Sequence, residues 1–122
     1  MKRILIVEDE EIMLDLLQRK LKTHGYEVLV ARDGEEGLKL IKKERPDLII
    51  MDLVMPKMDG FMVMEEIQKD EDLKKIPLIV VSNSGQPVEL NRVRDLGAKD
   101  WLIKTEFNPQ ELVEKIKKQL NE

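Results

Sequence analysis

The chain has 122 residues, the usual length of one domain and enough to bury a hydrophobic core without disulfides or structural metals. It has no cysteine, no apolar run long enough to cross a membrane and no secretory leader pattern, so we expect one cytoplasmic domain over residues 1–122. The 21 basic and 25 acidic residues are mixed along the chain and give a net charge of −4, which argues against direct binding to nucleic acid.

The first part of the chain shows two strand patterns, each followed by a helix pattern. Residues 4–7 form a short apolar run with β-branched side chains, which predicts a buried strand, and residues 26–31 predict a second one. The segment 33–47 contains a second helix, which Pro46 ends. The first helix begins near Glu10 and ends before a glycine, and its inward face is expected to carry Met13, Leu16, Leu17 and Leu21.

The rest of the chain repeats this alternation three times. Strands are expected at residues 47–52, 76–82 and 99–104, and the first two of these are apolar on both faces. A helix should follow each strand, the last two over residues 87–96 and 108–120. The helix after residues 47–52 places apolar side chains on one face at Phe61, Met64 and Ile67.

Two helix starts are marked by residues that cap helices well. Asp59 precedes the third helix, and Asn108 precedes the last helix, where Pro109 suits the first turn. The strict order of strand and helix, repeated five times, predicts an α/β fold with a five-stranded parallel sheet and helices on both faces.

Polar side chains stand at the ends of four of the expected strands. Ligands of open parallel sheets bind beyond the carboxyl ends of the strands, so these side chains are expected to converge on one edge. They are Glu8 and Asp9 after the first strand, Asp52 after the third, Ser82 after the fourth and Lys104 after the fifth.

Neighbouring carboxylates repel one another unless a cation lies between them, and Mg²⁺ prefers oxygen ligands. With Mg²⁺ and Lys104, this edge suits phosphoryl transfer to a carboxylate, for which Asp52 is the candidate because its strand is central. Plainer interpretations exist for each position alone. Glu8 and Asp9 could favour the start of a helix, Ser82 could be a turn residue, and Lys104 could be a surface charge. Their joint occurrence at four strand ends favours a shared site.

This set of positions resembles the receiver domain of two-component response regulators. The resemblance rests on the Glu8-Asp9 pair, on Asp52 in the segment MDLVMPKMDG, and on Ser82 and Lys104 at matching intervals, and it covers nearly the whole chain. It implies a flavodoxin-like sheet of order 2-1-3-4-5, as in single-domain regulators of the chemotaxis type. It also implies a phospho-acceptor signalling protein, which is not an enzyme beyond its own phosphotransfer and self-dephosphorylation.

The resemblance also implies roles for the residues at this edge. Asp52 would accept a phosphoryl group from a histidine kinase or a phosphotransfer protein. Asp9, Asp52 and the main-chain carbonyl of Val54 would ligate Mg²⁺, with Glu8 acting through water. The kinase, the input signal and the downstream protein target are not identified by the sequence.

The switch that follows phosphorylation is implied in the same way. Ser82 would move toward the new phosphate, and Trp101 would change its burial. The chain departs from the family after Lys104, where Thr105 replaces the usual proline of a cis peptide bond. A cis bond before another residue type costs about 3 kcal/mol, so we expect the Lys104–Thr105 bond to be trans.

Two further departures concern the lifetime of the phosphorylated state. Asn83 replaces the small residue that commonly follows Ser82, and Val54 offers no polar side chain to orient a water molecule. We therefore hypothesise a long-lived phosphorylated state. Two alternatives remain: a receiver-shaped interaction module that is never phosphorylated, and a phosphatase of the haloacid dehalogenase type, which would need an acid at Val54.

Overall fold

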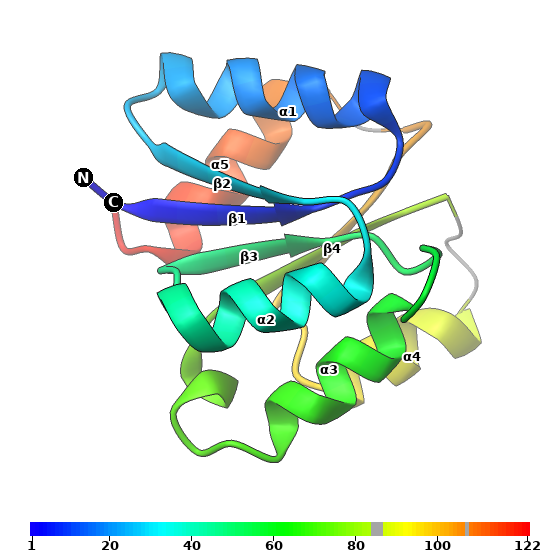
Figure 1. The fold of residues 1–122 in the computed structure, drawn as a ribbon. Helices are drawn as coiled ribbons and strands as arrows, with labels where there is room; N and C mark the ends of the chain where they lie inside the picture. Colours follow the sequence, from blue (N-terminus) through cyan, green and yellow to red (C-terminus); the bar gives the residue numbers. More distant parts are fainter. Residues whose placement is uncertain (84–86, 107) are drawn as a thin grey trace.

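The computed structural model describes residues 1–83, 87–106 and 108–122. Its strands form a single parallel sheet in the order β2-β1-β3-β4-β5, which confirms the predicted order (Figure 1). The strands are β1 (Arg3–Val7), β2 (Glu27–Ala31), β3 (Leu48–Met51), β4 (Leu78–Ser82) and β5 (Asp100–Ile103). Every residue of β3 and β4 is buried, as expected for central strands that are covered on both faces.

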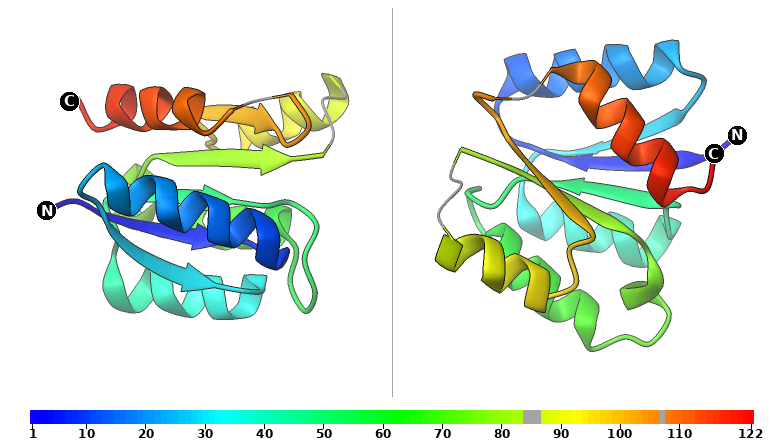
Figure 2. Two further views of the ribbon diagram at one scale, coloured as in Figure 1. Left: turned by 90° about the horizontal axis from the view of Figure 1, so that it is seen from above. Right: turned by 180° about the vertical axis from the view of Figure 1, so that it is seen from behind.

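Five α-helices cover the two faces of this sheet, as predicted. Helices α1 and α5 lie on one face and α2, α3 and α4 on the other, an arrangement that the views of Figure 2 also show. The helices are α1 (Glu11–Thr23), α2 (Gly34–Glu44), α3 (Gly60–Gln68), α4 (Pro87–Asp95) and α5 (Pro109–Gln119).

Alternation along each strand divides the core into two hydrophobic clusters. In β1, Leu5 and Val7 pack toward α2 and α3, whereas Ile4 and Ile6 pack toward α1 and α5. The same alternation continues through β3 and β4. Both clusters therefore hold the sheet rigid up to the carboxyl ends of its strands.

Both predicted caps are present. The Asp59 side chain accepts a hydrogen bond from the Met62 amide, and the Asn108 side chain accepts one from the Glu111 amide. Gly25, just past the end of α1, has a φ of 85°, which glycine adopts without the strain that a side chain brings.

The inward face of α1 differs from the prediction. Leu16 is 44% exposed, and Leu14, at 1% exposure, is buried beside Leu17 and Leu21. A short 3₁₀ helix at Leu73–Lys75 was also not predicted. Its start is held by the Asp70 carboxylate, which accepts hydrogen bonds from two following main-chain amides. Within the described ranges, no helix has the length and apolar character needed to cross a membrane.

Candidate phospho-acceptor site

The register of β1 against β3 places two acids side by side. Val7 pairs with Met51, so Glu8 and Asp52 are the next residues of adjacent strands. The Asp52 amide donates to the Val7 carbonyl at 3.0 Å, which holds Asp52 in line with β1. Glu8 is 1% exposed and Asp52 is 5% exposed, so both carboxylates are buried at the sheet edge.

Lys104 brings its ammonium group to both acids from the end of β5. Its amide donates to the Ser82 carbonyl at 2.7 Å, which extends the pairing of β5 with β4. Its Nζ lies 2.9 Å from Glu8 Oε1 and 3.2 Å from Asp52 Oδ2. It also lies 2.8 Å from Glu10 Oε1, an acid that the strand-end argument did not include. Lys104 is thus a buried counterion of the site.

Burial disfavours the charged form of both buried acids. Loss of solvation raises the pKa of Glu8 to about 7, although the hydrogen bond from Lys104 opposes this change. Burial likewise raises the pKa of Asp52, and the charge of Lys104 opposes it. Burial lowers the pKa of Lys104, but its hydrogen bonds to Glu10 and Glu8 more than compensate and raise it above its ordinary value. The single positive charge of Lys104 therefore does not fully offset the cost of burying both carboxylates.

A hollow of about 290 Å³ opens beside these groups. The predicted site residues Asp9, Asp52, Val54 and Ser82 all line it. The remaining lining residues are Glu10, Leu53, Phe61, Asn83 and Glu89. An incoming group in this hollow would therefore have access to the Asp52 carboxylate.

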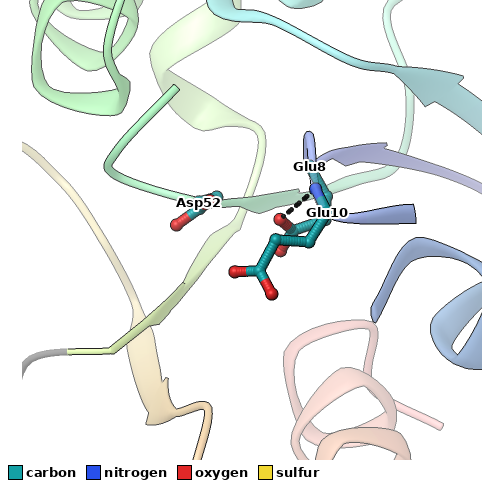
Figure 3. Close-up of side chains that lie close together, drawn as sticks. All are labelled: Glu8, Glu10 and Asp52. Atoms are coloured by element: carbon teal, nitrogen blue, oxygen red, sulfur yellow. Dashed lines mark hydrogen bonds between the residues drawn. The ribbon is translucent and has the colours of Figure 1, made fainter. Parts of the chain in front are cut away.

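The carboxylates fit a hard divalent cation. Oxygens of Glu8, Glu10 and Asp52 lie within 4.8 Å of one another, and Figure 3 shows the three side chains extending into the same region. Oxygen donors of this kind are those that Mg²⁺ prefers. Five acids (Glu8, Asp9, Glu10, Asp52 and Glu89) and one lysine give this edge and its hollow a formal charge of −4 (five negative charges and one positive). The residues present are therefore suited to a divalent ion.

The other predicted residues differ in where they lie relative to the hollow. Asp9 is exposed at the rim of the hollow, and the Val54 side chain is 80% exposed. Trp101, which is 37% exposed, lines a different recess with Leu102 and Ile103. The Lys104–Thr105 peptide bond is trans, as predicted.

Two acids of the site were missed by the strand-end argument. Glu10 stands at the N-cap of α1, where its side chain makes no capping hydrogen bond. A glutamate at a position that favours shorter polar residues was the available signal. Glu89, in the first turn of α4, has a buried Oε2 with no hydrogen-bond partner among the described residues. Nothing in its sequence position pointed to the hollow.

The loop after Asp52 is held by close packing against glycines. The Gly60 amide donates to the Leu53 carbonyl at 2.8 Å, and a Cβ on Gly60 would meet the Asp52 carbonyl oxygen. A Cβ on Gly34 would meet the Met58 carbonyl oxygen. The start of α2 therefore braces the loop that carries the site.

The sequence pattern of the response regulator receiver domain matches residues 4–117. This chain belongs to the response regulator receiver domain family. The ycf27 transcriptional regulator of Guillardia theta is 40% identical over 116 residues, which are 95% of this chain and 44% of that protein. The receiver domain thus spans less than half the length of that relative.

Solved structures agree with this membership. A response regulator from Chloroflexus aurantiacus has a TM-score of 0.91 at 33% identity, covering 99% of this chain and 98% of that one. The receiver domain of a sensor histidine kinase from Pseudomonas aeruginosa has a TM-score of 0.90 at 26% identity, covering 99% and 98%. That structure has a magnesium ion coordinated in its active-site cleft.

Proposed function

We propose that this receiver domain accepts a phosphoryl group on Asp52 from a histidine kinase or a phosphotransfer protein, and that phosphorylation changes its binding to a downstream protein. The observation that supports this best is the position of Asp52. Its carboxylate is buried at the end of a central strand, lines the hollow, and has Oδ2 3.2 Å from Lys104 Nζ.

In the proposed reaction, a carboxylate oxygen of Asp52 attacks phosphorus while the bond from phosphorus to the donor nitrogen breaks. The product is an acyl phosphate, which water later hydrolyses to restore the carboxylate and release inorganic phosphate. Lys104 would stabilise negative charge on the transferred group, and Ser82, which lines the same hollow, would do so with its hydroxyl after moving toward the phosphate.

Mg²⁺ is the proposed cofactor. Asp9, Asp52 and the main-chain carbonyl of Val54 would hold it, with Glu8 acting through water. When bound, the ion neutralises charge on the phosphoryl oxygens. The clustered carboxylate oxygens of Glu8, Glu10 and Asp52 support a divalent cation at this edge, and Asp9 and Val54 line the same hollow as Asp52.

The proposed output is a change in partner binding. Movement of Ser82 toward the phosphate would be accompanied by a change in the burial of Trp101. Trp101 lies in β5, the strand that Lys104 follows. The partners would be proteins and not nucleic acid, and the domain over residues 1–122 would act in the cytoplasm without catalysing turnover of a separate substrate.

The two alternatives receive less support. A haloacid dehalogenase-type phosphatase would need an acid at residue 54, where the side chain is an exposed valine. A receiver-shaped module that is never phosphorylated would have no need for the convergence of Glu8, Asp52 and Lys104, all of which have buried side chains.

Incubation with acetyl phosphate and Mg²⁺ tests the proposal. The expected result is a mass gain of about 80 daltons, the mass of one phosphoryl group, that is lost in Asp52→Asn and kept in Asp72→Asn. Asp72 is a matched control because it is exposed and lies outside the hollow. Absence of the mass gain in the wild type would favour the unphosphorylated module. Turnover of a phosphate ester that depends on Asp52 would favour the phosphatase.

A further inference from the structure

Glu10 occupies a helix-capping position without capping the helix. Its backbone is extended, with φ −80° and ψ 111°, as at an ordinary N-cap, but its side chain makes no capping hydrogen bond. Its amide donates to Glu8 Oε2 at 3.1 Å, and its side chain extends toward Asp52 (Figure 3). An aspartate or serine at this position would stabilise α1 more than glutamate does. The glutamate side chain instead makes a contact outside the helix.

That contact is with Lys104. The ammonium group has three N–H donors, and three carboxylates accept from it: those of Glu8, Glu10 and Asp52. Its distance to Glu10, 2.8 Å, is the shortest of the three hydrogen bonds. A phosphoryl oxygen on Asp52 would therefore compete with these acceptors for the N–H donors of Lys104.

Exposure decides which acceptor can leave. The side chains of Glu8 and Asp52 are 2% and 6% exposed, whereas that of Glu10 is 54% exposed. Rotation of the Glu10 side chain into solvent needs no movement of the sheet and leaves no buried charge behind. Glu8 cannot leave in this way because its carboxylate is buried.

We propose that Glu10 is a positioning residue that holds Lys104 in the unphosphorylated state and must release it when a phosphoryl group arrives. The proposal rests on the phospho-acceptor function of Asp52. The Glu10 carboxylate competes with the phosphoryl oxygens for Lys104 and also repels them, because both carry negative charge within the same hollow. Glu10 therefore lowers the affinity of the site for a phosphoryl group.

The experiment measures the affinity for beryllofluoride, a phosphoryl mimic, at saturating Mg²⁺ by fluorine NMR. Glu10→Gln and Glu10→Ala are each expected to bind it about fivefold more tightly than the wild type, the ratio expected for a partly exposed hydrogen bond between charged groups. Glu11→Gln is the matched control. Glu11 is the adjacent acid, is exposed, and pairs with Arg32 outside the hollow, so its variant should bind as the wild type does.

Equal or weaker binding by both Glu10 variants would overturn the proposal. Mg²⁺ affinity is measured separately in each variant, and a loss of more than tenfold on Glu10→Gln would make Glu10 a metal ligand, which also overturns it. If the wild type fails to bind beryllofluoride, the proposed function of Asp52 falls and this inference with it. If the wild type binds beryllofluoride and the Glu10 variants bind it with the same affinity as the wild type, only the inference about Glu10 falls. Urea unfolding of each variant shows whether it is folded.

Discussion

Lys104 and Glu8 form a buried ion pair across the site, with Nζ 2.9 Å from Glu8 Oε1 and side chains that are 4% and 2% exposed. The two residues are 96 positions apart in the chain and follow β5 and β1. The pair does not fully offset the cost of burying the Glu8 carboxylate, because the pKa of Glu8 is still raised to about 7.

The first prediction concerns the pH dependence of stability without divalent ions. The pKa of Glu8 is about 7 in the folded protein and near 4.5 when unfolded, so the folded state binds more protons between these values. The free energy of unfolding should therefore fall as pH rises from 4.5 to 7, by up to about 3 kcal/mol from this group. The raised pKa of Asp52 acts in the same direction.

Urea unfolding in EDTA across this range measures the change. Glu8→Gln serves as the reference, because every other titrating group is shared with the wild type. The difference between the two proteins should grow with pH to the disadvantage of the wild type. A wild type that gains stability relative to Glu8→Gln as pH rises would contradict the prediction.

The second prediction concerns addition of Mg²⁺. A ligand that binds only the folded state at tenfold above its dissociation constant raises the free energy of unfolding by about 1.4 kcal/mol. The wild type should show this increase, and Asp52→Asn should lose most of it. In EDTA, Asp52→Asn should be more stable than the wild type by about 1 kcal/mol, since one of the crowded buried acids becomes neutral. If Mg²⁺ raises the free energy of unfolding equally in the two proteins, Asp52 is not a ligand of the ion.

The third prediction concerns the glycine that braces the loop after Asp52. Gly34→Ala should destabilise the protein by about 1–3 kcal/mol, because the new Cβ meets the Met58 carbonyl oxygen and the loop must shift. Phosphorylation by acetyl phosphate should slow in the same variant. Glu35→Ala, at the next and exposed position of α2, is the control and should change stability by no more than about 0.5 kcal/mol. The idea is falsified if Gly34→Ala phosphorylates at the wild-type rate.

The fourth prediction concerns the lifetime of the phosphorylated state. Val54 lines the hollow but offers no polar side chain to orient a water molecule, and Asn83 lines the same hollow where a smaller residue would leave more room for water. The acyl phosphate should therefore persist for minutes or longer after the donor is removed, and Val54→Asn should shorten this time severalfold. Met62→Asn, an exposed apolar position outside the hollow, should leave it unchanged. A wild-type half-life of seconds would refute the hypothesis.

The fifth prediction uses the single tryptophan of the chain. Trp101 is 37% exposed in β5, so a change in its burial should alter its fluorescence. Addition of Mg²⁺ and beryllofluoride should change the emission of the wild type but not that of Asp52→Asn. An unchanged spectrum at saturation, with binding shown independently, would mean that Trp101 is not part of the switch.

Local patterns were sufficient to predict a parallel α/β sheet and the polar residues at its edge, whereas the order of the strands was implied by the resemblance to receiver domains. The apolar runs of β1, β3 and β4 marked buried strands because only a sheet covered on both faces has no polar side. The polar residues that end these runs then predicted the edge where Asp52 and Ser82 lie, since parallel strands share one carboxyl edge. The caps at Asp59 and Asn108 were predictable because the hydrogen bonds involved join residues three apart.

Other features were not predictable from local patterns. Apolar residues cover two faces of α1, so periodicity could not show that Leu14 is buried and Leu16 is exposed. Packing against the sheet and α5 decides between these faces.

The sequence by itself determined the alternation of strands and helices and the identity of the acids and the lysine that end the strands, because each depends on neighbours within a few residues. Only the tertiary structure decided that Glu10 meets Lys104, 94 residues away, and that the charged forms of Glu8 and Asp52 are disfavoured. Both outcomes depend on strand register and on removal of water from the sheet edge, which exist only after distant segments have packed together.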